Sequence, residues 1–194
     1  GWAMQPSPER GAQVWGPQYT PFAACAAAGN LLKLTPVQMD AAMGVTGTYA
    51  PVPSAYKYFG IVDETRPMRE AKLGWGWMSM AGVMGALSAK AGFRGGHGIL
   101  DGKEGFWIMA GSDQCDFKKM TQGLGREWLI LGTDFKLHPS IAWSHPPFVA
   151  LQKLIEQHAI KASDVAKVRV WNVGVTRIAD YDPRGAVDAQ FSLP

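Results

Sequence analysis

WGWMSMAGVMGALSAKA, residues 75–91, mixes glycine and alanine with tryptophan, methionine and leucine at helical spacing. The pattern predicts a helix over these residues. Gly92 follows directly and supplies a C-terminal stop, because glycine enters the left-handed conformation that ends many helices at little cost. A long helix of this composition indicates a mainly helical fold.

A second helix is predicted on the N-terminal side, over residues 20–33, where small residues and leucine recur at helical spacing. Its alanines and glycine imply close packing against neighbouring helices. The segments at 1–19 and 51–72 are rich in proline and are predicted to be loops, the second of them long and ordered. Residues 92–107 are rich in glycine and are predicted to form turns. A phosphate-binding loop is the less favoured alternative, because neither the Walker nor the dinucleotide-binding spacing of glycines is present.

A third helix is signalled by TPVQ, residues 35–38. Thr35 is a suitable N-cap, Pro36 suits the first helical position, and Gln38 completes a capping box. We expect this helix to end near Met43, before the glycines of the sequence that follows.

The pattern changes near residue 126. EWLILG, residues 127–132, predicts a strand, and PPFVALQKLIEQHAI, residues 146–160, predicts an amphipathic helix that begins with prolines. Val168, Val170 and Val173 alternate in part and predict a second strand.

The predicted fold class is therefore mostly α with an α+β part. An Ala/Gly-rich helical half-domain, residues 1–125, precedes a strand–helix–strand lid domain, residues 126–194. No internal repeat or low-complexity tract is present.

Composition narrows the possible partners and compartments. The net charge is +3 and no run of basic residues occurs, which argues against nucleic acid, whereas small anions remain possible ligands. Cys25 and Cys115 have no metal-binding spacing, so we expect free thiols in a reducing, cytoplasmic compartment. The most apolar run, residues 21–32, is too short and too rich in alanine to span a membrane.

The candidate site lies in FKLHPSIAWSHPP, residues 135–147. Lys136 stands between a phenylalanine and a proline bend, where a cation costs stability unless an anion faces it. Its ammonium is predicted to point into a cleft, with a structural salt bridge as the alternative. The histidines His138 and His145 are candidates too, although a lone histidine is more often a structural hydrogen-bonding group.

Four segments in order resemble the MmgE/PrpD family of enzymes. They are LLKLTPVQMDAAMGVTGT (31–48), AKLGWGWMSMAGVMGALSAKAGFRG (71–95), GLGREWLILGTDFKLHPSIAWSHPPFVALQKL (123–154) and AVDAQFSLP (186–194). The resemblance covers essentially the whole chain. It implies dehydratases, decarboxylases or epimerases of small polycarboxylates, such as 2-methylcitrate, cis-aconitate and iminodisuccinate, that work without metal or redox cofactor.

The resemblance also implies roles for particular residues. Lys136 matches a family lysine, and His145 matches the histidine nine positions later, which would orient Lys136 or cap the following helix. Lys72 falls within one residue of a substrate-contacting lysine, and Tyr181 lies near a tyrosine implicated in decarboxylation. Lys136 and Lys72 are thus expected to bind substrate carboxylates. Two further residues, Arg69 and His138, are candidates for the same task.

Two features depart from the family pattern. In GWAM, residues 1–4, Ala3 stands where the family has an active-site histidine. LGWG, residues 73–76, lacks the second histidine that the family pattern has in this segment. Family members are also longer than this chain, which resembles the middle of a larger enzyme. We therefore expect little or no turnover from it alone, and association either as a homodimer or with a subunit that supplies the missing half.

Three functions remain open. The first is a lyase that forms a carbanion beside a carboxylate of a di- or tricarboxylate, a chemistry that needs cations and a proton-transfer group. The second is an epimerase or isomerase of an imino- or amino-dicarboxylate, and the third is a non-catalytic chain that binds a carboxylate or a partner subunit.

Overall fold

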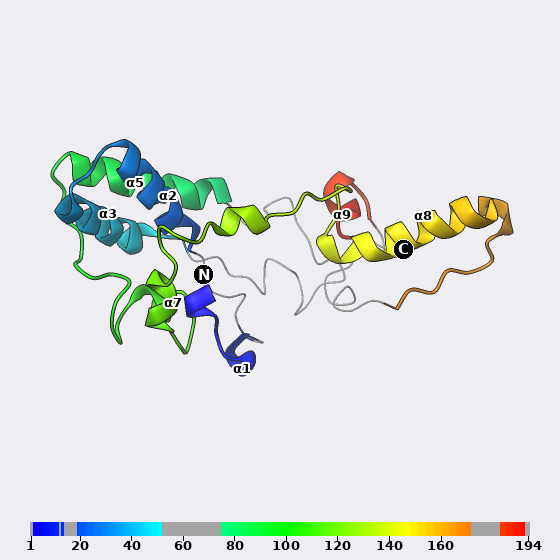
Figure 1. The fold of residues 1–194 in the computed structure, drawn as a ribbon, viewed down its shortest axis with the longest axis horizontal. Coiled ribbons are helices and arrows are strands. Elements are labelled where there is room, and N and C mark those ends of the chain that lie inside the picture. The colour runs from blue at the N-terminus through cyan, green and yellow to red at the C-terminus, as the bar shows by residue number, and fades with distance from the viewer. Residues whose placement is uncertain (1, 12, 14–18, 52–74, 172–182, 193–194) are drawn as a thin grey trace. The chain divides into compact units, whose positions relative to one another are not determined.

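A computed structural model describes residues 2–11, 13, 19–51, 75–171 and 183–192 of the chain (Figure 1). The described residues up to Glu127 form one unit, and those from Trp128 onward form a second. The first unit contains η1 (Trp2–Met4), α1 (Pro8–Gly11), α2 (Thr20–Leu31), α3 (Pro36–Tyr49), α5 (Trp75–Lys90), α6 (Phe106–Met109) and α7 (Phe117–Thr121). The second contains η2 (Leu129–Gly132), η3 (Ala142–Ser144), α8 (His145–His158), η4 (Ala162–Asp164) and α9 (Ala186–Ala189).

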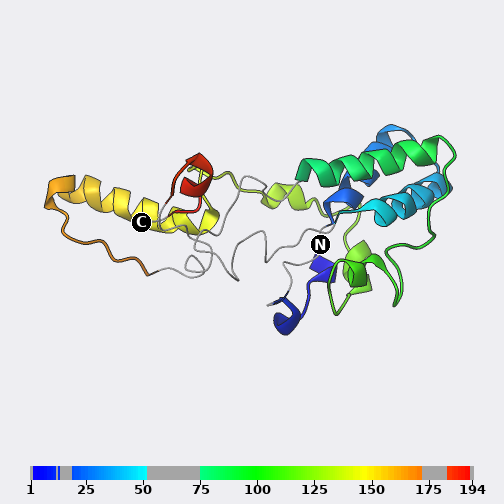
Figure 2. The ribbon, with the colours of Figure 1, turned by 180° about the vertical axis from the view of Figure 1, so that it is seen from behind.

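The core of the first unit is a bundle of α2, α3 and α5. These helices lie side by side, as the opposite views of Figures 1 and 2 both show. Four small buried side chains, at most 2% exposed, form the contact: Cys25, Ala42, Ala86 and Ala89. All three helices were predicted from the sequence, and the structure confirms them.

Small residues set the distance between these helices. A methyl group added at Gly82 of α5 would lie 2.0 Å from the carbonyl oxygen of Pro21 in α2. One added at Gly85 would lie 2.1 Å from Thr46 Oγ1 in α3. Real side chains essentially never approach so closely, so α5 packs on both neighbours only because these positions carry no side chain.

Helix α3 begins where the sequence predicted and ends later. Thr35 Oγ1 accepts a hydrogen bond from Gln38 N at 3.3 Å, and Gln38 Oε1 accepts one from Thr35 N at 3.0 Å. The helix continues beyond Met43 to Tyr49, so its predicted end was wrong. The glycine expected to stop it, Gly44, instead gives room to the backbone of the turn at residues 95–96.

A second small core lies beside the bundle. The rings of Phe22 and Phe106 meet edge to face, with centroids 4.7 Å apart. Phe106, Phe22 and Ala110 are buried together, which fixes α6 and its preceding turn against α2. The α5 helix itself ends at Lys90, and Gly92 follows two residues later with a φ of +95° and an amide that donates to Ala89 O at 3.1 Å. The predicted stop is therefore confirmed.

The described residues contain no β-strand, which corrects the strand–helix–strand prediction for 126–194. Residues 129–132 form the 3₁₀-helix η2 instead, and Leu129, Ile130 and Leu131 are 75–84% exposed. A short continuous apolar run does not distinguish a strand from other structures by its periodicity. The helix predicted from residue 146 is confirmed as α8, which begins one residue earlier.

The second predicted strand is also absent from the described residues. Val168 and Val170 are 57% and 44% exposed, and no neighbouring strand among those residues pairs with them. A strand requires a partner that completes its backbone hydrogen bonds. Val173 lies outside the described residues.

Candidate functional site

Lys136 lies in a tight bend that leads into α8. Its Nζ donates a hydrogen bond to Ser140 O at 3.1 Å, and the residue as a whole is exposed. The bend is fixed by buried hydroxyls, because Ser144 Oγ lies 2.8 Å from Ser140 Oγ and 2.7 Å from Ile141 O. An ammonium has three donors, so Lys136 retains two for a ligand.

The two histidines of this bend contact each other. The rings of His138 and His145 have centroids 5.3 Å apart at 77°, and His138 also meets Phe148 edge to face at 5.8 Å. His145 is the first residue of α8. Its Nε2 is inaccessible to solvent and has no hydrogen-bond partner within the described structure. An unpaired buried nitrogen of this kind costs about 1–3 kcal/mol, and a ligand or further chain could satisfy it.

The structure thus brings Lys136, His138 and His145 into one bend, which we call the lysine–histidine bend. Within it Lys136 is bonded to Ser140 rather than to His145. Three other predicted site residues lie outside the described residues: Arg69, Lys72 and Tyr181.

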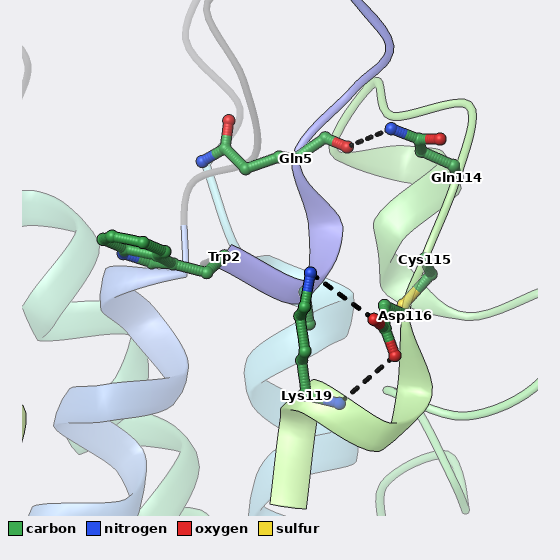
Figure 3. A pocket seen from close by; sticks show the side chains of 7 residues that line it. Trp2, Gln5, Gln114, Cys115, Asp116 and Lys119 are labelled. Atoms are coloured by element: carbon green, nitrogen blue, oxygen red, sulfur yellow. Dashed lines mark hydrogen bonds and ion pairs between the residues drawn. The ribbon is translucent and has the colours of Figure 1, made fainter. Parts of the chain in front are cut away.

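Ala3, where the resemblance of the sequence implied a histidine, lines a pocket of about 300 Å³ in the first unit (Figure 3). The other lining residues are Trp2, Gln5, Gln114, Cys115, Asp116 and Lys119. Two hydrogen bonds connect the two segments of the chain that line this pocket. Asp116 N donates to Ala3 O at 2.8 Å, and Gln114 Nε2 donates to Gln5 O at 3.1 Å. We refer to it as the Ala3 pocket.

The polar groups of the Ala3 pocket were not found by sequence reasoning. Lys119 Nζ lies 3.5 Å from Asp116 Oδ2, and Figure 3 shows the two side chains facing each other. Burial, with a smaller effect of Asp116, raises the pKa of the Cys115 thiol. The thiol is therefore protonated at neutral pH and is a poor nucleophile. The one local signal was Asp116 before FKKMT, which is the N-cap of α7.

An apolar groove of about 360 Å³ lies in the second unit, between the first turns of α8 and residues 168–171. Arg169 is the charged residue among those that line it. The groove offers no proton-transfer group, so it is not a candidate for the chemistry discussed here.

Among the described residues, no group of three or more histidine, cysteine, aspartate or glutamate side chains is placed to hold a metal ion. None of the helices in the described ranges has both the length and the apolar character needed to cross a bilayer.

Comparison with known proteins identifies the class. Residues 8–118 match the model of the MmgE/PrpD N-terminal domain, which is more than half of the chain. The chain therefore belongs to the MmgE/PrpD family, as the resemblance of its motifs predicted.

Two curated relatives agree with this assignment. The cis-aconitate decarboxylase-like protein oryM of Aspergillus oryzae is 29% identical over 145 residues. The cis-aconitate decarboxylase of Aspergillus terreus is 27% identical over the same length. Each alignment covers 72% of this chain and 28% of the relative, so the chain spans only a part of these proteins.

Proposed function

We propose that this chain is part of a lyase, a dehydratase or decarboxylase, that acts on a small di- or tricarboxylate through a carbanion-type intermediate. The observation that carries the proposal is the family match over residues 8–118, together with two relatives whose names describe cis-aconitate decarboxylation. In this scheme residues 1–125 belong to the helical domain of the family and residues 126–194 to its second domain.

The proposed chemistry assigns separate tasks to the residues of the lysine–histidine bend. A carbanion beside a carboxylate forms more easily when cations hold the carboxylates, and Lys136 has two donors free for one of them. His145 would transfer the proton, because its Nε2 has no hydrogen-bond partner among the described residues; since this nitrogen is closed to solvent there, the substrate would reach it only after the bend opens. His138 would pack against His145 and bind substrate at its edge.

Three residues outside the described ranges complete the proposal. Lys72 and Arg69 would bind further carboxylate groups of the substrate, and Tyr181 would take part in proton transfer. No metal or redox cofactor has a role in this chemistry.

A second candidate, an epimerase or isomerase of an imino- or amino-dicarboxylate, is favoured by one observation. Ala3 stands where the resemblance implies a histidine, and it lines one pocket together with Lys119 and Asp116. A changed proton-transfer group at that position would suit a different reaction. A third candidate is a carboxylate-binding chain without catalytic activity.

The first experiment measures binding of cis-aconitate and citrate to the purified chain by calorimetry. Lys136→Ala should weaken binding by roughly 1.5–3 kcal/mol, the value of a hydrogen bond to a charged group. Lys136→Arg should restore only part of it, because the donors of a guanidinium are fixed in a plane. Lys153→Ala, a change on the exposed face of α8, is the matched control and should bind as the parent does. Equal binding by Lys136→Ala and the parent would refute the carboxylate role.

The second experiment separates the two reactions. The chain is incubated in deuterated water with 2-methylcitrate, cis-aconitate and iminodisuccinate, and products are followed by NMR. Elimination or decarboxylation supports the lyase, and exchange with inversion supports the epimerase. Binding without exchange or product is the result expected both of a lyase part that needs the missing half and of a non-catalytic chain. His145→Gln should abolish whichever reaction is found.

We also propose that the chain self-associates through α5. Bulky side chains on one face of this helix are exposed in the described structure: Trp77, Met80, Val83, Met84 and Leu87. No charged residue occurs between Trp75 and Ala89, so the face can meet its copy in a second chain without repulsion. Exposed apolar patches of this kind usually mark interaction sites.

A further inference from the structure

The Ala3 pocket is built from two chain segments far apart in the sequence. Besides the two hydrogen bonds described above, Ser7 Oγ lies 2.5 Å from Asp113 Oδ2, and Arg10 Nε donates to Gly111 O at 2.8 Å. These contacts fix the segment of η1 and α1 onto the loop before α7. The pocket lies wholly in the first unit and contains no residue of the lysine–histidine bend.

A pair of opposite charges dominates this pocket. Lys119 and Asp116 both line the pocket, and their side chains are 59% and 47% exposed, so solvent reaches both charged groups. Their separation of 3.5 Å exceeds the 2.7–2.9 Å typical of a charge-assisted hydrogen bond. Asp116 Oδ1 accepts from Lys119 N at 3.3 Å, which holds the carboxylate in place. Each charged group therefore has hydrogen-bonding capacity left for a ligand.

Charge complementarity selects the kind of ligand. A simple carboxylate would be attracted by Lys119 and repelled by Asp116, whereas a simple amine would experience the reverse. A molecule with both groups on neighbouring atoms satisfies both side chains at once. We propose that the Ala3 pocket binds a small zwitterion of the α-amino acid type, with its carboxylate on Lys119 and its ammonium on Asp116.

The remaining lining residues fit a ligand of this size. A volume of about 300 Å³ is at the lower end for ligand pockets, which favours an amino acid with a short side chain. Trp2 also lines the pocket; its indole, 82% exposed, points away from Asp116 and Lys119 in Figure 3. The lining of the Ala3 pocket shares no residue with the lysine–histidine bend, so its ligand can be tested without changing Lys136, His138 or His145.

The test is an NMR titration of the ¹⁵N-labelled full chain with alanine, propionate and ethylamine at matched ionic strength and pH 7. Alanine should cause saturable shifts at Cys115, Lys119 and the side-chain amide of Gln114. Propionate and ethylamine should bind at least about tenfold more weakly, because each meets one like charge. Equal binding of propionate and alanine would overturn the proposal in favour of a carboxylate site. The absence of saturable shifts with alanine would overturn it altogether.

Variants connect the binding to the charge pair. Asp116→Asn keeps an N-cap for α7, and Lys119→Met keeps most of the side-chain length. Each variant should bind alanine roughly tenfold more weakly or worse, while the remaining signals of its NMR spectrum stay those of the folded chain. Lys118→Met is the matched control, since Lys118 is exposed on the same helix and does not line the pocket. Unchanged alanine binding in both pocket variants would refute the assignment.

Discussion

Asp40 Oδ2 lies 2.6 Å from His97 Nδ1, a contact that joins helix α3 to the turn after α5. The backbone amide of Gly98 donates to the other oxygen of Asp40 at 3.3 Å. The hydrogen bond to Asp40, then its charge, raises the pKa of His97 above the ordinary value. The same hydrogen bond lowers the pKa of Asp40. The pair therefore makes the stability of the first unit depend on pH.

The direction of this dependence follows from the two shifts. Because the pKa of His97 is raised in the folded state, its contribution to stability is complete at pH values below the unfolded-state pKa of about 6.5. This contribution is lost as the pH rises through the folded-state pKa. Because the pKa of Asp40 is lowered in the folded state, its contribution to stability is complete at pH values above the unfolded-state pKa of about 3.9. It is lost as the pH falls through the folded-state pKa. Stabilisation by Asp40 and His97 should be greatest between these values. The fall in the thermal midpoint above pH 6.5 should be smaller in His97→Gln than in the parent.

Direct titration by NMR gives the sharper test of this pair. His97 should titrate above about 6.5 in the parent, and Asp40→Asn should return its pKa toward that value. Asp101→Asn is the matched control, because its charge has only a small effect on the pKa of His97. An unchanged His97 titration in Asp40→Asn would show that the contact does not exist in solution.

The sequence predicted the parts of the fold that local chemistry controls. The capping box of Thr35 and Gln38 involves residues three apart, and a C-terminal glycine such as Gly92 acts on its own helix. The predicted end of α3 was wrong because Gly44 allows the backbone of residues 95–96, far along the chain, to pack closely against the helix. The role of that glycine became visible only once the helices were packed.

The same distinction applies to the candidate sites. Lys136, His138 and His145 lie within ten residues of one another, so the sequence could place them in one bend. The Ala3 pocket joins residues 2–5 to residues 114–119, and no pattern of spacing reveals a contact of that length. The strand predicted at 127–132 failed because its apolar residues are exposed rather than buried between neighbours.

The capping box makes a prediction about stability. Thr35→Ala should lower the free energy of unfolding by about 1 kcal/mol, because it leaves Gln38 N without its acceptor. Thr35→Ser keeps the hydroxyl and is the matched control. Urea denaturation measures both, and an Ala variant as stable as the Ser variant would mean that the cap contributes nothing.

Close helix packing makes a second prediction about stability. Gly82→Ala should destabilise the chain by roughly 1–3 kcal/mol or more, since the new methyl group meets the backbone of Pro21. Gly76→Ala is the matched control on the same helix, where nothing lies within 4 Å of the added atom. That control should be neutral or stabilise by up to about 1 kcal/mol, because alanine favours helices over glycine. Equal midpoints for the two variants in thermal denaturation would contradict the packing of α5 on α2.

The exposed face of α5 predicts how the chain associates. Trp77 and Met84 are 66% and 54% exposed. A charged side chain placed on this face would have to be buried in any complex that covers it, which costs free energy. Met84→Glu should therefore weaken self-association by roughly tenfold or more, because like charges from the two copies would also meet. Val37→Glu changes an equally apolar residue, 80% exposed at the start of α3, and should associate as the parent does. Analytical ultracentrifugation across micromolar concentrations measures the oligomeric state of the parent, Met84→Glu and Val37→Glu. A parent chain that is monomeric throughout, or a Met84→Glu variant that associates as strongly as the parent, would show that this face does not pair with its copy.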